Sequence, residues 1–145
     1  MTFEPADLLA AAVTARALAY APYSGFSVGA ALVTPEGRVF TGENVENASY
    51  GLSMCAERVA IYNAVSHGER RFAAVAVTGP DGLRAMPCGA CRQVLHEFGP
   101  AMQVILPDGD HLRIVPLSAL LPEAFGGGDL AAASNGAAPA QREAR

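Results

Sequence analysis

Apolar residues recur at helical spacing in three long segments of the chain. The first runs from Pro5 to Tyr20, the second from Cys55 to Val65 and the third from Cys88 to Phe98. Pro5 suits the first turn of a helix, because the N–H that it lacks would be unpaired there in any case. A shorter segment from Leu117 to Phe125 has room for one more helix. We therefore expect three full helices and a short last one.

Strand patterns fill the intervals between the expected helices. Residues 26–34 and 38–45 flank the turn Pro35-Glu36-Gly37 and predict a β-hairpin. Residues 72–78 form an almost unbroken apolar run, which is typical of a strand buried on both faces. Two further short strands are expected at 102–106 and 112–115. This order of elements predicts an α/β fold, a three-layer α/β/α sandwich around a mixed β-sheet.

The length of the chain suits a single domain. Its 145 residues can bury a hydrophobic core without disulfides or a partner domain, and 51% of them are apolar. From Gly126 onward, small and polar residues replace the large apolar ones, so burial cannot offset the entropy of ordering this stretch. We expect one folded domain over residues 1–125 and a flexible tail over residues 126–145.

Charge and the lack of targeting signals narrow the class of partner. The net charge of −4, without an arginine cluster, argues against a nucleic acid polymer, since phosphate binding relies on dense positive charge. No apolar run approaches the length of a membrane span, and the N-terminus has no signal-peptide pattern. An odd number of cysteines indicates a reducing compartment. These features favour a small-molecule substrate, no membrane partner and a cytoplasmic location.

The three cysteines belong to two short motifs, Cys55-Ala56-Glu57 and Pro87-Cys88-Gly89-Ala90-Cys91. Three thiolates suit zinc, and three protein ligands on a metal that prefers four leave one position open. A water in that position becomes acidic enough to attack a substrate, and Glu57 is placed to carry its protons. A structural zinc site would normally be closed by a fourth Cys or His. The pattern therefore predicts a catalytic zinc site.

Both motifs stand where a helix is expected to begin. The free N–H groups and partial positive charge of a helix N-terminus favour the thiolate over the thiol. Two such ends that converge would build a three-cysteine site without long loops. Because three thiolates leave excess negative charge on a zinc site, we expect Arg58 and Arg92 to offset it through hydrogen bonds to the sulfurs.

Other interpretations exist for parts of this pattern. A Cys-x-x-Cys pair alone is also typical of a redox site or of half a structural zinc knuckle, although the upstream Cys55-Ala56-Glu57 disfavours both. His67, His96 and His111 are alternative metal ligands. None of these histidines stands at short ligand spacing from a cysteine, so packing or surface roles suit them better.

Three segments of the chain closely resemble the zinc-dependent cytidine deaminases. They are Asn44-Val45-Glu46-Asn47-Ala48-Ser49-Tyr50-Gly51, Cys55-Ala56-Glu57-Arg58 and Pro87-Cys88-Gly89-Ala90-Cys91-Arg92-Gln93. The likeness runs from about the first expected helix to Phe125. Cysteine at position 55 and the short chain are similar to the small homotetrameric branch of that family. The resemblance implies a cytidine deaminase-like fold, one Zn²⁺ per subunit and a homotetramer whose pockets are completed by neighbouring subunits.

The resemblance also implies roles for single residues. Cys55, Cys88 and Cys91 would bind zinc, and Glu57 would shuttle protons. Asn44 and Glu46 would hold the ribose hydroxyls, and Phe26 and the Ala56 backbone would contact the pyrimidine base. In this branch a loop from a neighbouring subunit and a C-terminal aromatic residue complete the pocket, and the candidates for these two parts are Tyr50 and Phe125. Without the resemblance, a polar pair such as Asn44 and Glu46 is more often structural than functional.

The implied reaction is the hydrolytic deamination of cytidine and 2′-deoxycytidine to uridine and 2′-deoxyuridine, with release of ammonia, in pyrimidine salvage. In this reaction a zinc-bound hydroxide attacks C4 while Glu57 moves the protons. One rival is an aminonucleoside-antibiotic deaminase of the same superfamily, which Asn44 and Glu46 disfavour. The other rival is a non-catalytic zinc-stabilised binding protein, which has no need of a carboxylate at position 57.

Overall fold

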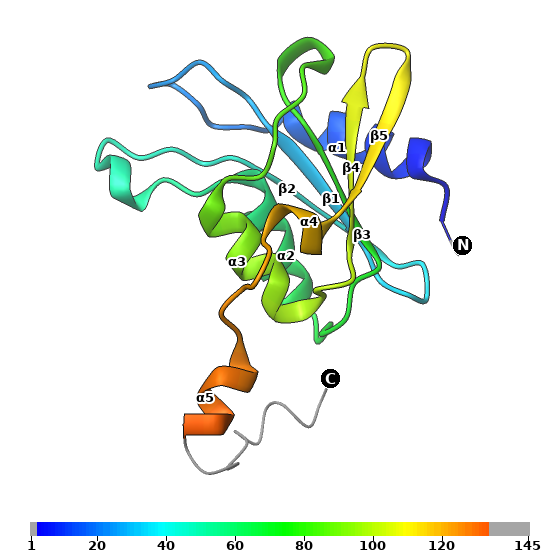
Figure 1. Ribbon diagram of the computed structural model, residues 1–145. Coiled ribbons are helices and arrows are strands. Elements are labelled where there is room, and N and C mark those ends of the chain that lie inside the picture. The colour runs from blue at the N-terminus through cyan, green and yellow to red at the C-terminus, as the bar shows by residue number, and fades with distance from the viewer. Residues whose placement is uncertain (1–2, 134–145) are drawn as a thin grey trace.

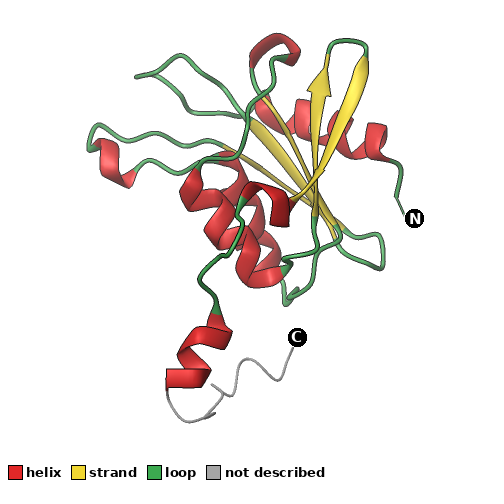
Figure 2. Cartoon of the chain, in the orientation of Figure 1, coloured by secondary structure: helices red, strands yellow, loops and turns green. Residues whose placement is uncertain are grey.

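The computed structural model describes residues 3–133, which form a layered α/β structure (Figure 1, Figure 2). Its helices are α1 (Pro5–Arg16), α2 (Ala56–Ser66), α3 (Gly89–Phe98), α4 (Leu117–Leu120) and α5 (Gly127–Ala133), with two short 3-10 helices at Tyr50–Leu52 and Pro80–Gly82. Its strands are β1 (Gly29–Val33), β2 (Val39–Glu43), β3 (Ala74–Thr78), β4 (Gln103–Asp108) and β5 (His111–Pro116).

The five strands make one mixed sheet in the order β2-β1-β3-β4-β5. Strand β1 pairs antiparallel with both β2 and β3, β3 runs parallel to β4, and β4 pairs antiparallel with β5. Helix α1 covers one face of the sheet, whereas α2 and α3 lie side by side on the other (Figure 1). The predicted three-layer α/β/α sandwich around a mixed sheet is confirmed.

Two buried clusters, one on each face of the sheet, form the core. Because successive side chains of a strand point to opposite faces, each inner strand contributes to both clusters. Ala30 and Leu32 of β1 pack beneath α2, whereas Ala31 and Val33 pack against α1. The run of β3 is almost unbroken in apolar residues because its side chains alternate between two buried faces, and all its residues from Ala74 to Val77 belong to one cluster or the other.

Glycine allows both layers of helix to approach the sheet closely. A Cβ atom on Gly29 would lie 1.9 Å from the carbonyl oxygen of Ala12 in α1. A Cβ atom on Gly42 would lie 2.3 Å from the amide nitrogen of Ala60 in α2. Any larger residue would push α2 outward, so Gly42 helps to set the position of the helix that carries Glu57.

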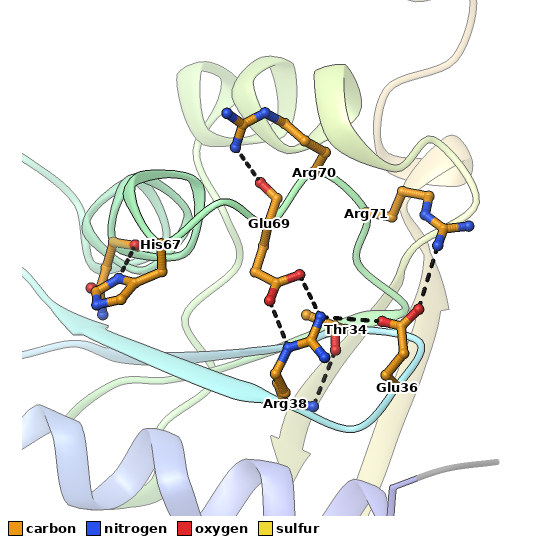
Figure 3. Close-up of polar contacts among 8 residues, drawn as sticks. Thr34, Glu36, Arg38, His67, Glu69, Arg70 and Arg71 are labelled. Carbon is orange, nitrogen blue, oxygen red and sulfur yellow. Dashed lines mark hydrogen bonds and ion pairs between the residues drawn. The ribbon is translucent and has the colours of Figure 1, made fainter. Parts of the chain in front are cut away.

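Charged residues tie the β1–β2 turn to the segment between α2 and β3 (Figure 3). The Arg38 guanidinium binds both carboxylate oxygens of Glu69, at 2.6 and 2.9 Å. Glu36 lies within ion-pair distance of Arg38 and Arg71, at 3.7 and 3.4 Å. Solvent screens most of these charges, so they orient the turn more than they stabilise the fold.

Two helices end earlier than the sequence predicts, for identifiable reasons. Helix α1 stops at Arg16 rather than Tyr20, because the backbone of Tyr20 pairs with the segment at Asn44 and Glu46 instead (N···O 2.9 and 2.8 Å). Helix α4 stops at Leu120 rather than Phe125, because the residue before Pro122 is disfavoured in a helix.

The segment after residue 125 is helical in its first part, Gly127–Ala133. The rest of the predicted tail, 134–145, lies outside the described residues. Within residues 3–133, no helix combines the length and the apolar character needed to cross a bilayer.

Candidate functional site

Two helix N-termini bring the three cysteines together. Cys55 directly precedes α2, Cys88 directly precedes α3, and Cys91 lies in the first turn of α3. Their sulfur atoms all lie within 4.8 Å of one another, and those of Cys55 and Cys88 are 3.9 Å apart. The structure thus joins motifs that are far apart in the sequence, as the sequence predicts.

This donor set fits zinc. Tetrahedral zinc with bonds of about 2.3 Å places two sulfur ligands about 3.8 Å apart, close to the separation of Cys55 and Cys88. The three cysteines are free of disulfides, and no fourth His, Cys, Asp or Glu joins their group within residues 3–133. Three soft ligands and one open position are typical of a catalytic rather than a structural zinc site.

The sulfur atoms share hydrogen bonds that shift their pKa values in opposite directions. The hydrogen bond from the Cys91 thiol, helped by those from Arg58 and Cys88 and opposed by burial, lowers the pKa of Cys55 to about 5. The same bond to Cys55, followed by burial, raises the pKa of Cys91. Cys55 is therefore readier than Cys91 to ionise and bind a cation.

The two arginines expected beside the sulfurs behave differently. Arg58 donates from Nη2 to the Cys55 sulfur at 3.4 Å, and this bond is the main cause that raises the pKa of its guanidinium. Arg92 instead donates to the backbone carbonyls of Pro87 and Leu120, at 2.7 and 2.8 Å. The prediction of a sulfur contact thus fits Arg58, whereas Arg92 ties the loop before Cys88 to α4.

Glu57 occupies the second position of α2, where it is 4% exposed. Burial is the largest cause that raises the pKa of its carboxyl group, with the neighbouring Cys55 adding to the effect. A carboxyl group whose pKa lies nearer to neutrality can both accept and donate a proton under mild conditions. This environment suits the proton-carrying role expected from the sequence.

One cavity of about 330 Å³ extends from Cys55, Cys88 and Glu57 to Phe26, Asn44 and Glu46. Its lining includes Ser24, Phe26, Val28, Asn44, Glu46, Ser53, Met54, Cys55, Ala56, Glu57, Ala85, Met86 and Cys88. Cys55 and Cys88 therefore face the same cavity as the polar pair Asn44 and Glu46. This volume lies in the range of pockets that hold small organic molecules.

Asn44 and Glu46 follow β2 and hold the loop that carries Phe26. Asn44 accepts from the Val28 amide through Oδ1 and donates through Nδ2 to the Phe26 carbonyl, both at 2.8 Å. The Glu46 carboxylate accepts from the Tyr23 and Ser24 amides at 2.9 and 3.1 Å and from the Ser24 hydroxyl at 2.5 Å. These bonds, above all that from the Ser24 hydroxyl, lower the pKa of Glu46.

Tyr50 and Phe125 lie outside this cavity. Tyr50 is 75% exposed, and its ring meets that of Tyr23 edge to face at 5.9 Å beside a separate hollow of about 290 Å³. Phe125 is 58% exposed, and its carbonyl accepts a hydrogen bond from Gln93. Within one copy of the chain, neither ring meets the cysteine group.

Part of the cavity wall was not predicted from the sequence. Met54, Ala85 and Met86 line the cavity, and none of them is among the predicted site residues. Arg84 forms an ion pair with Asp108, which ties the loop before Pro87 to the end of β4. Direct adjacency to Cys55 and to Pro87-Cys88 was the available signal, because the neighbours of metal ligands commonly wall the same site.

Comparison with known proteins agrees with this site. Residues 4–106 match the family model described as the cytidine and deoxycytidylate deaminase zinc-binding region. A cytidine deaminase of Halalkalibacterium halodurans is 48% identical over 126 residues, which cover 85% of this chain and 95% of that protein. A cytidine deaminase of Mycobacterium tuberculosis is 49% identical over 82% of this chain and 87% of its own length.

Solved structures agree with the sequence relatives. The crystal structure of cytidine deaminase from Burkholderia pseudomallei superimposes with a TM-score of 0.80 at 51% identity, covering 85% of this chain and all of that one. That of Mycobacterium tuberculosis gives 0.77 at 44% identity over 86% and 98%. With three cysteines gathered at two helix N-termini beside a buried glutamate, this chain belongs to the zinc-binding cytidine and deoxycytidylate deaminase family.

Proposed function

We propose that the protein hydrolyses the exocyclic amine of cytidine and 2′-deoxycytidine, which yields uridine or 2′-deoxyuridine and ammonia and would serve pyrimidine salvage. The observation that carries the proposal is the cavity that Cys55, Cys88, buried Glu57 and the pair Asn44 and Glu46 line together. Relatives named cytidine deaminase at 45–49% identity support it.

We assign the metal to Cys55, Cys88 and Cys91, with one Zn²⁺ per subunit. When bound, zinc acidifies a coordinated water and stabilises developing negative charge. Arg58 offsets part of the negative charge of the thiolates, because it donates to the Cys55 sulfur. Three thiols that must stay reduced to bind a metal favour a reducing compartment such as the cytoplasm.

Glu57 is the proposed proton carrier. Its carboxylate accepts a proton from the attacking water, delivers it to N3 of the pyrimidine, and later helps to protonate the amine that leaves from C4. A C4–O bond forms, the C4–N bond breaks, and the second proton of the water converts the leaving NH2 group to ammonia. The raised pKa of Glu57 suits this exchange, and acid–base catalysis of this kind typically contributes about 10²–10⁴-fold.

The base is proposed to lie between Phe26 and the start of α2. Phe26 supplies an apolar ring to the cavity, and Ala56 is the fully buried first residue of the helix. The N–H groups of a first helical turn have no partner within the helix, so the backbone at Ala56 is free to bind a polar edge of the pyrimidine. These contacts place C4 toward the cysteine group.

Asn44 and Glu46 are the proposed sugar contacts. Each keeps hydrogen-bonding capacity beyond its bonds to the 23–28 loop, since an amide has two donors and a carboxylate about four acceptor positions. A base without a sugar would leave this remaining capacity unused and would lose the hydrogen bonds that a sugar hydroxyl makes with it. We therefore expect free cytosine to be a far poorer substrate than cytidine.

A homotetramer is proposed from the likeness to the small homotetrameric branch and from the exposure of two aromatic side chains. Tyr50 and Phe125 are strongly exposed aromatic residues outside the cavity of their own chain. They would be buried if each completed the pocket of a neighbouring subunit. Sedimentation analysis of the purified protein tests this assembly, and a stable active monomer would contradict it.

The activity test uses the purified, zinc-loaded protein. Incubation with cytidine should form uridine and ammonia in equal amounts, in a sample whose bound zinc is measured to be about one ion per chain. Full zinc occupancy without conversion of cytidine or 2′-deoxycytidine would contradict the proposal. Turnover of an aminonucleoside antibiotic instead would identify the first rival, and no turnover of either would favour a zinc-stabilised binding protein.

A further inference from the structure

The hydroxyl of Ser24 links two residues that line the cavity, Phe26 and Glu46. It donates to Oε2 of Glu46 at 2.5 Å and accepts from the Phe26 amide at 3.0 Å. Phe26 and Glu46 belong to different segments, the loop before β1 and the loop after β2. One exposed side chain therefore couples the residue proposed for the base to the residue proposed for the sugar.

The two oxygen atoms of the Glu46 carboxylate differ in the number of hydrogen bonds that they already accept. Oε1 already accepts two amides, those of Tyr23 and Ser24. Oε2 accepts only the Ser24 hydroxyl, so one of its acceptor positions remains for a ligand. Because a hydrogen bond to a charged carboxylate is stronger than one between neutral groups, the Ser24 hydroxyl, together with the two amides on Oε1, orients that position.

We infer that Ser24 is a positioning residue for sugar recognition, a role that rests on the nucleoside deamination proposed above. Its hydroxyl orients Oε2 of Glu46 toward a sugar hydroxyl. The same hydroxyl accepts from the Phe26 amide and so fixes the position of the Phe26 backbone relative to Glu46. Ser24 acts through Glu46 and Phe26 and takes no part in proton transfer at the base. Removal of the Ser24 hydroxyl should therefore weaken the binding of the sugar hydroxyls and leave the reaction at C4 largely unchanged.

A kinetic comparison of substrates tests this role. The variants are Ser24→Ala, Ser24→Thr, which keeps a hydroxyl, and the control Ser66→Ala, whose exposed hydroxyl donates to the Asn63 carbonyl at the end of α2. We expect Ser24→Ala to lower the ratio of kcat/KM for cytidine over 2′,3′-dideoxycytidine about tenfold, mainly through KM for cytidine. Ser24→Thr should restore most of the ratio, and Ser66→Ala should leave it unchanged.

A second measurement is independent of turnover. Carboxyl ¹³C NMR of the zinc-loaded protein should show a higher pKa for Glu46 in Ser24→Ala than in the wild type, because the Ser24 hydroxyl is the largest cause that lowers it. An unchanged Glu46 pKa would overturn the inference even if the protein deaminates nothing. If Ser24→Ala is active and has a raised Glu46 pKa but an unchanged ratio of kcat/KM for the two substrates, the proposed link between Ser24 and sugar recognition is overturned. Failure of the wild type on cytidine would count against the proposed function alone.

Discussion

Arg58 donates from Nη2 to the sulfur of Cys55 across one turn of α2, at 3.4 Å. Its Nε atom is buried and has no hydrogen-bond partner among residues 3–133. A buried donor without a partner costs free energy, so the guanidinium is held here by its interaction with the thiolate group. The relationship shows how a zinc site of three thiolates would avoid an excess of negative charge.

Arg58→Gln should retain zinc but lose about tenfold in kcat, because the charge that offsets the thiolates is removed while a polar side chain remains. Arg58→Lys should lose less. Zinc stoichiometry and steady-state kinetics on cytidine measure both effects. Equal activity in the wild type and in Arg58→Gln would show that the guanidinium has no electrostatic role.

Glu57→Gln should keep the fold and the metal and lose about 10²–10⁴-fold in turnover, since only the proton carrier is removed. The amide has nearly the same shape as the carboxyl group, so the cavity should be preserved. Cytidine turnover, bound zinc and the melting temperature are measured on one preparation. Glu43→Gln, a change on β2 outside the cavity lining, serves as the matched control. Undiminished deamination in Glu57→Gln would disprove the assigned role.

Cys88→Ala should lose zinc and stability together, because metal binding contributes to the folding free energy when its ligands are drawn from separate elements. The wild type treated with a chelator should show a similar fall in melting temperature. Metal analysis and thermal unfolding provide the comparison. Full zinc occupancy in Cys88→Ala would remove this residue from the ligand set.

Acid should weaken the link between Arg38 and Glu69. The hydrogen bond and charge of Arg38 lower the pKa of Glu69 in the folded state. The contribution of this carboxylate is therefore present above its ordinary unfolded pKa and is lost as the pH falls through the lower folded value. Glu69→Gln should have a lower melting temperature than the wild type at neutral pH, and the gap should close in acid. A gap that widens in acid would contradict this sign.

Gly42→Ala should destabilise the protein by about 1–3 kcal/mol, because its added Cβ would overlap the backbone of α2 at Ala60. Gly51→Ala is the matched control, since a Cβ at that position meets nothing within 4 Å. Denaturant unfolding of both zinc-loaded variants measures the difference. Equal stability of the two would mean that β2 and α2 can separate at no cost.

Local patterns were sufficient to predict most of the elements. Helical spacing identified α2 and α3, and the apolar run at 72–78 identified β3, because these segments bury a whole face or both faces. The ends of helices were less predictable. Helix α1 stops early because Tyr20 pairs with a distant segment, a competition that its own sequence does not reveal.

Some residues of the candidate site could likewise be predicted from local patterns, and others could not. The two cysteine motifs and Glu57 could be identified from residue type and spacing, since three thiolates and one acid have few other uses together. The partners of Arg92 and the role of Ser24 could not. Arg92 binds carbonyls of two separate segments, and Ser24 joins two loops, so both depend on contacts between parts of the chain that are distant in sequence.

Residue type and spacing alone establish the chemistry available to this protein: three thiols, a neighbouring carboxyl group and the polar pair Asn44 and Glu46. Only the packed fold shows that Cys55, Cys88, Glu57 and the polar pair line one cavity, that Arg58 rather than Arg92 meets a sulfur, and that Tyr50 and Phe125 lie outside. Residue type sets what a group can bind or donate, whereas its distance, burial and partners arise only when helices α2 and α3 pack on the same face of the sheet.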